Sequence, residues 1–223
     1  MKMKTVEGKV VALGSQGVGK TSMIISYIEK AFKQHVNPTI AASFFTCKLN
    51  VENARVMLQV WDTAGQERFK SMAPMYYRNA SAAMLVFDLT KYNTFTAMKG
   101  WVTELRRNVE QAMILVVIGN KSDLRNERQV DAEEGRVYAT KIGASYYETS
   151  ALQNNGIENV FLAIGIGLLK LSSTEHDSSS ITVYESTNSD WSSTDVSLTP
   201  SLEENPQNLS IAHGIYEKPH RCC

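Results

Sequence analysis

The chain has 223 residues, of which 43% are hydrophobic and 21% charged, and its formal net charge is zero. This length and composition suit one ordinary globular domain with a remainder, and the neutral balance argues against nucleic acid as a partner. Eight acidic and two basic residues follow position 171, so that segment carries a net charge of −6 and the part before it carries +6. The three cysteines (Cys47, Cys222 and Cys223) show no disulfide or zinc spacing, which favours a reducing compartment. We see no secretory signal and no apolar run long enough to span a bilayer.

The first elements surround a phosphate-binding motif. A short apolar strand is expected over 9–13, followed by a loop at Gly14–Thr21 and a helix over 22–28. The loop fits G-x-x-x-x-G-K-[ST], in which glycines let backbone N–H groups approach phosphate oxygens at the positive end of a helix. In this motif Lys20 reaches the β- and γ-phosphates and Thr21 offers a hydroxyl to Mg²⁺. The order of strand, loop and helix favours a nucleoside triphosphate site.

The rest of the chain alternates between strand and helix patterns. Asn37-Pro38 interrupts an exposed loop over 33–39. Strands are expected over 44–51, 55–62, 82–87, 113–119 and 145–148, and helices over 94–109, 131–142 and 154–171. This alternation predicts an α/β fold with a six-stranded, mostly parallel sheet and helices on both faces. Gly165 and Gly167 fall inside the last helix, where close packing against a neighbour would explain them.

The end of the chain has a different composition. Beyond residue 171 the periodicity stops, and serine, threonine, asparagine and acidic residues dominate. Such a segment buries too little apolar surface to offset its ordering entropy. We therefore expect a domain over 1–171 and a disordered tail over 172–223.

Two polar stretches follow predicted strands, at the edge where ligands gather in open α/β sheets. Asp62–Gln66 follows one strand, and Asn120–Asp123 follows another. The Asp123 carboxylate can accept hydrogen bonds from N1–H and the exocyclic amine of guanine, which adenine does not offer, so the wrong base would leave it unpaired. The alternative for Asn120–Asp123 is an ordinary polar turn, because turn chemistry favours Asn and Asp.

The motifs together resemble a known family. Gly14–Thr21, Asp62–Gln66, Asn120–Asp123 and Glu148–Ala151 stand in the order and rough spacing of the Ras-like small GTPases, over about residues 6–171. The chain is thereby identified as resembling P-loop NTPases with a Ras-like G domain. Trp61–Phe69, Tyr76–Arg78 and the double-cysteine terminus resemble the Rab branch. Thr39–Phe44 and Ser71–Tyr77 resemble the Rabs of early endosomes.

The resemblance implies that the chain binds GTP or GDP with Mg²⁺. It implies that Thr21 and Thr39 supply hydroxyls to Mg²⁺ and that Asp62 holds it through water. It makes Gln66 the catalytic residue, which orients the attacking water as in the Ras example of phosphoryl transfer. The other residues that it assigns to the nucleotide are Ser15, Gln16, Gly17, Val18, Gly19, Lys20, Ser22, Phe32, Gly65, Asn120, Lys121, Asp123, Ser150, Ala151 and Leu152. Without the resemblance, Phe32 reads as a core aromatic.

The resemblance also implies a switch that partners recognise. Thr39 and Gly65 would reach the γ-phosphate from two loops, so that GTP orders the loops and hydrolysis releases them. Phe44, Trp61 and Tyr76 match the aromatic triad that Rabs present to effectors, although packing on the sheet explains each of them equally well.

Three residues depart from the family pattern. Gln16 would crowd the γ-phosphate, which predicts slow intrinsic hydrolysis and a rate supplied by a helper protein. Ala41 replaces a usual glycine after Thr39-Ile40 and would stiffen or misplace the first switch, and Leu152 makes one cover of the base apolar. None of the three removes a phosphate or metal ligand.

The terminal cysteines complete the Rab-like pattern. The resemblance to Rabs implies geranylgeranylation of Cys222 and Cys223. Two lipids fit an acidic tail that supplies no basic patch, since stable anchoring takes two signals. The implied partners are an exchange factor, a GTPase-activating protein, a GDP-dissociation inhibitor, a Rab escort protein and effectors, with no nucleic acid and a monomeric switch. The implied location is the cytoplasmic face of intracellular membranes, endosomes above all, with a cytosolic pool.

The leading hypothesis is thus a Rab-like GTP-dependent switch in vesicle traffic. A phosphate-loop kinase is a second possibility, although no lid or acceptor domain follows the motif. A third is a nucleotide-bound interaction protein that scarcely cycles, which Gln16 and Ala41 favour.

Overall fold

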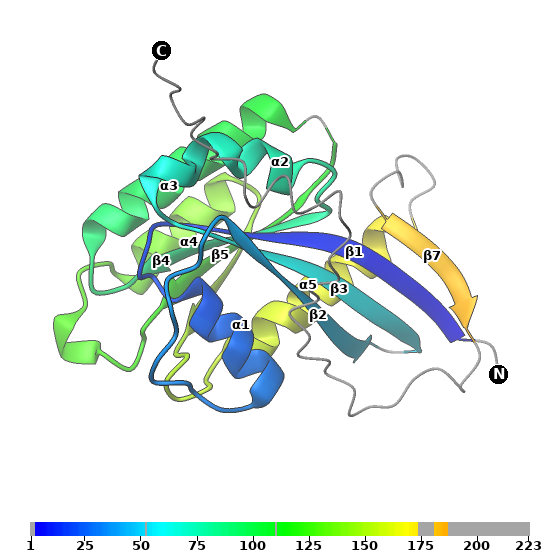
Figure 1. Ribbon diagram of the computed structural model, residues 1–223, viewed down its shortest axis with the longest axis horizontal. Helices are drawn as coiled ribbons and strands as arrows, with labels where there is room; N and C mark the ends of the chain where they lie inside the picture. The colour runs from blue at the N-terminus through cyan, green and yellow to red at the C-terminus, as the bar shows by residue number, and fades with distance from the viewer. Residues whose placement is uncertain (1–2, 52, 110, 174–180, 187–223) are drawn as a thin grey trace, which may run out of the picture.

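The computed structural model describes residues 3–51, 53–109, 111–173 and 181–186. They form three layers, with a sheet between two layers of helices (Figure 1). The strands are β1 (Met3–Leu13), β2 (Ala42–Val51), β3 (Ala54–Thr63), β4 (Ala82–Asp88), β5 (Ile114–Asn120), β6 (Ser145–Thr149) and β7 (Ile181–Ser186). The helices are α1 (Lys20–Glu29), α2 (Ala73–Tyr77), α3 (Tyr92–Asn108), α4 (Ala132–Lys141) and α5 (Ile157–Leu171), with 3₁₀ turns η1 (Glu67–Met72) and η2 (Arg125–Glu127).

The strand order is β2-β3-β1-β4-β5-β6. Neighbours are parallel except for the β2–β3 hairpin, which is antiparallel. The predicted α/β fold with a mostly parallel sheet and helices on both faces is therefore confirmed. Because parallel strands end at the same edge, the loops that follow β1, β3, β5 and β6 meet there. These loops carry the motifs singled out in the sequence.

The tail contributes a seventh strand, whereas six were predicted. β7 pairs antiparallel with β1, from Met3 opposite Ser186 to Gly8 opposite Ile181, and Figure 1 shows it beside the N-terminal part of β1. The expectation of a disordered tail is therefore wrong for residues 181–186. The rest of the tail, with Cys222 and Cys223, lies outside the described residues, and for it the division at residue 171 stays a prediction.

Alternate side chains of the central strands enter two separate hydrophobic clusters. In β4, Met84 and Val86 belong to one cluster, and Leu85 and Phe87 belong to the other; all four are fully buried. α1 and α5 cover the first face of the sheet, and α2, α3 and α4 cover the second (Figure 1). Strands buried on both faces need near-continuous apolar runs, which is why the sequence of β4 shows no alternation.

The glycines of α5 permit close helix–sheet packing. A methyl group on Gly165 would lie 2.7 Å from the Leu49 side chain of β2, and one on Gly167 would lie 2.8 Å from Ile114 of β5. Close packing therefore explains both glycines, as the sequence suggested. No helix among the residues that the structure describes has the length and apolar character needed to cross a membrane.

Candidate functional site

The phosphate-loop segment links the end of β1 to the start of α1, as its motif requires. Gly17 and Gly19 have φ of 78° and 95°, a left-handed conformation that glycine adopts without steric cost. The Lys20 side chain is buried, and its Nζ donates hydrogen bonds to the carbonyl oxygens of Gly14 at 2.8 Å and Ser15 at 3.0 Å. The loop thus curls around one ammonium group.

Lys20 and Asp62 form a buried pair of opposite charges. Burial lowers the pKa of Lys20 to about 8, and the nearby Asp62 carboxylate opposes that shift. Burial also raises the pKa of Asp62, against the hydrogen bond from Thr21 and the charge of Lys20. Both charged forms therefore lack solvation that a bound ligand can supply. An anion next to Lys20 and a cation next to Asp62 would each make up that loss.

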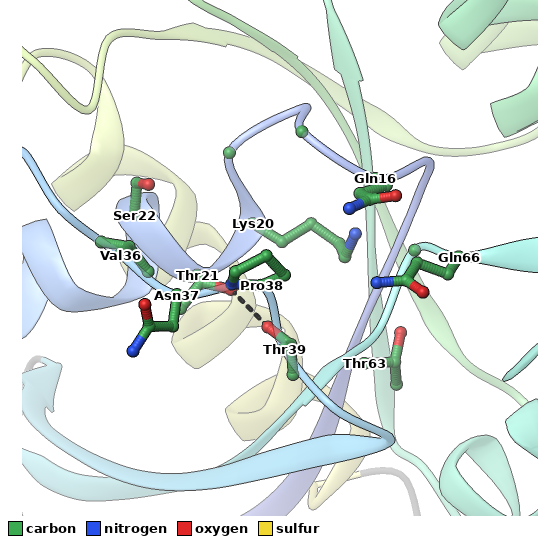
Figure 2. Close-up of a pocket in the computed structure, with 13 residues that line it drawn as sticks. Gln16, Lys20, Thr21, Ser22, Val36, Asn37, Pro38, Thr39, Thr63 and Gln66 are labelled. Carbon is green, nitrogen blue, oxygen red and sulfur yellow. Dashed lines mark hydrogen bonds between the residues drawn. The ribbon is translucent and has the colours of Figure 1, made fainter.

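Thr21, Thr39 and Asp62 converge on one point from α1, from the loop before β2 and from the end of β3. The two threonine Oγ1 atoms lie 2.9 Å apart (Figure 2). Oδ2 of Asp62 accepts hydrogen bonds from Thr21 at 2.5 Å and from Thr39 at 3.1 Å. Its Oδ1 is buried and has no hydrogen-bond partner among the described residues. Two hydroxyls beside an under-used carboxylate fit Mg²⁺, which takes oxygen ligands and keeps several waters.

The loop after β3 lies directly against the phosphate loop. A side chain on Gly65 would overlap the backbone of Ser15 and Gln16, so glycine alone allows this approach. Figure 2 shows the side chains of Gln16 and Gln66 pointing toward the end of Lys20. Both glutamines are therefore within the region where a terminal phosphate beside Lys20 would lie.

These residues surround a pocket of about 200 Å³. Its lining from the sequence-predicted set is Gln16, Gly17, Gly19, Lys20, Thr21, Ser22, Thr39, Gly65 and Gln66. Val36, Asn37, Pro38 and Thr63 also line it, and the sequence analysis missed them. A signal was present for Asn37 and Pro38, because a loop that carries Thr39 to the pocket must bring its preceding residues along.

The residues predicted to read the base form a hydrogen-bond network that is connected to the phosphate loop. Nδ2 of Asn120 donates to the carbonyl of Val18 at 2.8 Å, and its Oδ1 accepts from Thr149 at 3.1 Å. Oγ of Ser150 donates to the Asp123 carboxylate at 2.5 Å. The loops after β5 and β6 are therefore fixed to each other and to the phosphate loop, which holds Asp123 in one orientation.

Lys121 is held by a residue that the sequence analysis missed. Its Nζ lies 2.6 Å from Oδ2 of Asp88, the last residue of β4. Burial would raise the pKa of Asp88, but hydrogen bonds from Lys121 and Thr90 outweigh it and leave the pKa below its usual value. The end of β4 lies at the same edge as Asp62, and this position was the available signal.

Val18, Phe32, Ala151 and Leu152, which were also predicted, do not line this pocket. Val18 and Ala151 are buried, whereas Leu152 is exposed. Phe32 is 37% exposed, so it is not the core aromatic that was the alternative for it. Ser26, fully buried on α1, was also missed, and its hydroxyl lies 3.2 Å from the carbonyl oxygen of Ala151.

The predicted aromatic triad forms a continuous, half-buried cluster. The ring centroids of Phe44 and Trp61 are 5.4 Å apart, and those of Trp61 and Tyr76 are 5.9 Å apart. The ammonium of Lys9 lies 5.3 Å from the Trp61 ring centroid. The three rings thus join β2, β3 and α2 on one surface, and they remain accessible to a partner.

Comparison with known proteins follows the same lines as the geometry. The model of the Ras family matches residues 9–169. RabJ of Dictyostelium discoideum is 47% identical over 165 residues, which cover 74% of this chain and 64% of RabJ. Rab-21 of Homo sapiens is 48% identical over 154 residues, covering 69% and 68% of the two chains. Rab5 of Nicotiana tabacum is 42% identical over 159 residues, covering 71% and 80%.

Proposed function

The chain belongs to the Ras family, as a Rab-type small GTPase, and from this premise we propose that it switches between GTP- and GDP-bound states to recruit effectors in vesicle traffic. The observation that carries the proposal is the convergence of Thr21, Thr39 and Asp62. It ties the loop before β2, through Thr39, to the end of β3, at the place where a metal-bound triphosphate would lie.

Mg²⁺ is part of this proposal. Thr21 and Thr39 would hold it through their hydroxyls, and Asp62 would hold it through water. When bound, the ion would offset negative charge on the phosphates. Lys20 would contact the β- and γ-phosphates, and Gly65 would give its N–H to the γ-phosphate. Loss of the γ-phosphate would remove what holds Thr39 and Gly65 in place, which releases both loops.

We assign guanine recognition to the loops after β5 and β6. Asp123 would accept hydrogen bonds from the base, with its carboxylate oriented by Ser150. Lys121 would cover one side of the base, held by Asp88, and Phe32 would meet it edge-on. The N–H of Ala151 would donate to O6 of guanine. Adenine has neither the N1–H group that Asp123 would accept from nor the O6 atom that Ala151 would donate to, so it would leave these protein groups unpaired.

A direct test is the nucleotide preference. The protein should bind GTP and GDP far more tightly than ATP, as measured by titration with fluorescent nucleotides. Asp123→Asn replaces a charged acceptor by a neutral amide and should weaken GDP binding at least tenfold, because one good charge-assisted hydrogen bond is worth about 1.5–3 kcal/mol. Asp131→Asn, at the exposed start of α4, is the matched control and should leave the affinity unchanged. Tighter binding of ATP would overturn the proposal.

Hydrolysis is expected to be slow without a helper protein. Gln66 would orient the attacking water, and Gln16 lines the same pocket, with its side chain also directed toward the end of Lys20, where the terminal phosphate would lie. An unaided rate above about 10⁻² s⁻¹, typical of a GTPase with its own arginine in place, would contradict this.

A non-cycling interaction protein on the same fold is the second candidate, and one observation favours it. Ala41 has a φ of 59°, which is a strained conformation for alanine. It lies at the end of the loop before β2 that carries Thr39, which is the first switch loop of the proposal. Comparison of GTP hydrolysis by the wild type and by Gln66→Leu separates the two functions. Equal rates favour the non-cycling protein, and a clear loss in the variant favours the cycling switch.

Membrane attachment through geranylgeranyl groups on Cys222 and Cys223 is a further part of the proposal, with endosomal membranes as the location. The similarity to Rab-21 and Rab5 supports the choice of endosomal membranes. The regulators would be an exchange factor, a GTPase-activating protein, a GDP-dissociation inhibitor and an escort protein. The Cys222→Ser, Cys223→Ser double variant should appear in the soluble fraction after cell lysis. Retention in the membrane fraction would refute the lipid anchor.

A further inference from the structure

β1 extends beyond β4, its neighbour on one side of the sheet. β3 accompanies β1 from Lys4 to Ala12. β4 pairs only with Val10 to Leu13, on the other side. Without another strand, the edge of β1 over residues 3–8 would therefore present unpaired backbone groups in the middle of the sheet. Such an edge binds an extended peptide readily.

The tail strand β7 occupies this edge in the structure. Six residues of β7 pair with residues 3–8 of β1, and Figure 1 shows the two strands side by side. Ile181 is 8% exposed and packs in the same hydrophobic cluster as Val6 and Leu168. The hydroxyl of Tyr184 donates to the Glu7 carboxylate at 3.0 Å. The occupant is thus defined by register and by two side-chain contacts.

β7 is held by its backbone pairing with β1, by one buried side chain and by the exposed hydrogen bond between Tyr184 and Glu7. Val183 is 45% exposed and Tyr184 is 39% exposed. Among the described strands, β7 pairs with β1 alone. Few buried contacts and an open outer edge are the properties of segments that detach locally while the rest of a domain stays folded. β4, whose seven residues are all buried, is the opposite case.

We propose that residues 3–8 of β1 form a strand-docking site, and that residues 181–186 of the same chain are its resident, detachable occupant. While β7 is docked, the tail is fastened to the sheet at a fixed register. When β7 detaches, the edge of β1 becomes open for an extended segment. The tail is therefore more than a passive connection between the domain and its terminal cysteines.

Amide hydrogen exchange of the full-length, GDP-bound protein followed by NMR tests this assignment. Successive N–H groups of a strand point to opposite edges, so alternate amides of residues 3–8 face β7 and the intervening ones face β3. The amides that face β7 should exchange at least tenfold faster than those of β4, because they open with β7 alone. The intervening amides should remain protected.

Two serine variants separate docking from general stability. Ile181→Ser removes the buried anchor and should speed exchange at the alternate amides of 3–8 at least tenfold, since burial of one large aliphatic side chain is worth that factor or more. Val183→Ser, at an exposed position of the same strand, should change these rates less than threefold. Exchange in β4 and β5 should be the same in both variants.

Three outcomes would overturn the proposal. If the alternate amides exchange only at the rate of β4 in the wild type and in Ile181→Ser, β7 is an integral strand and does not detach. If Ile181→Ser leaves the exchange at residues 3–8 unchanged, β7 is not the occupant. If protection at residues 3–8 increases with protein concentration, the occupant is a strand from a second copy of the chain.

Discussion

Ala41 carries a side chain in a backbone conformation that suits glycine. Its φ is 59°, and its carbonyl accepts a hydrogen bond from the N–H of Ala64 at 2.9 Å. A left-handed alanine costs about 1–2 kcal/mol. Glycine avoids that cost, but it makes the unfolded chain more flexible than alanine does, which lowers the free energy of unfolding by about 0.4–1 kcal/mol. The first switch loop therefore ends in a residue that weakens its ordered conformation.

We expect Ala41→Gly to stabilise the folded protein by up to about 1.6 kcal/mol, which is the largest difference between the relieved strain and the added unfolded-state entropy. Ala42→Gly, one residue further and inside β2, should destabilise it by about 0.5–1 kcal/mol, as glycine does within a strand. Urea unfolding of both variants with a saturating, non-hydrolysable GTP analogue measures the difference. Equal losses in the two variants would show that Ala41 is unstrained.

Ser26 joins α1 to the loop that would meet the guanine base. Its buried Oγ lies 3.2 Å from the carbonyl oxygen of Ala151 and 3.1 Å from Oδ1 of Asn154. Ser26→Ala removes the donor and should speed GDP dissociation about three- to tenfold, because a neutral hydrogen bond contributes about 1 kcal/mol. Stopped-flow release of a fluorescent GDP checks this. Thr96→Ala, on the exposed side of α3, should leave the rate unchanged.

Two helical glycines, Gly165 and Gly100, have very different space around them. Gly165 of α5 faces Leu49 at a distance that leaves no room for a methyl group. Around Gly100 of α3, no described atom beyond its chain neighbours and its own helix backbone lies within 4 Å of such a group. Gly100→Ala should stabilise the protein by about 0.5–1 kcal/mol through helix propensity. Gly165→Ala gains the same propensity but overpacks the contact with β2, which costs about 1–3 kcal/mol.

The two alanine variants should therefore shift the thermal unfolding midpoint in opposite directions, upward for Gly100→Ala and downward for Gly165→Ala. Calorimetry of the GDP-bound protein measures both shifts. An upward shift in both would mean that α5 moves away from β2 at little cost, and that close packing does not account for Gly165.

The edge strand β6 is fastened by an ion pair. Arg128 donates to both carboxylate oxygens of Glu148, at 2.8 and 2.5 Å, and the hydroxyl of Tyr146 donates to the same carboxylate at 2.8 Å. The hydrogen bond from Arg128, against partial burial, lowers the pKa of Glu148. Because its pKa is lower in the folded protein, the Glu148 carboxylate contributes stability at pH values above its pKa in the unfolded chain, which is about 4.5. That contribution is lost as the pH falls through the lower, folded value.

Glu148→Gln should therefore cost about 1.5–3 kcal/mol of unfolding free energy at pH 7, the usual worth of charge-assisted hydrogen bonds. The difference from the wild type should narrow once the pH falls below about 4.5, which urea titrations at several pH values would reveal. Glu158→Gln is the control, since its side chain is 80% exposed and its ion pair with Lys30 spans 3.9 Å. A gap independent of pH would mean that shape, and not charge, is what Glu148 contributes.

Across the whole molecule, the sequence predicted most features that follow from a local pattern or motif. It predicted few features that depend on contacts between residues far apart in the chain. The apolar runs of β4 and β5 and the phosphate loop follow rules that hold within a short window. The left-handed conformation of Ala41 does not follow from its residue type, and only the family resemblance, which has a glycine there, marked the position. Asp88 lies at the end of a strand, as Asp62 does, yet no motif distinguished it.

The two errors in the sheet share one cause. The first strand was predicted over 9–13 but begins at Met3, because polar residues such as Lys4 and Glu7 interrupt its apolar pattern. These same residues create the long edge that β7 covers. The run Ile181-Thr182-Val183-Tyr184 has strong strand propensity, but its polar surroundings concealed it. A strand that forms only against a distant partner cannot be read from its own neighbourhood.

The sheet divides the hydrophobic interior into two clusters, and α1 and α2 pack in different ones. The helix that carries Lys20 and Thr21 rests with α5 on one side, and the short helix α2, which follows Gly65 and Gln66, rests with α3 on the other. A rearrangement of α2 therefore disturbs one compartment only. In the proposed switch, the packing of α1 with α5 beneath the phosphate loop would therefore be kept while α2 rearranges, and the nucleotide would stay bound.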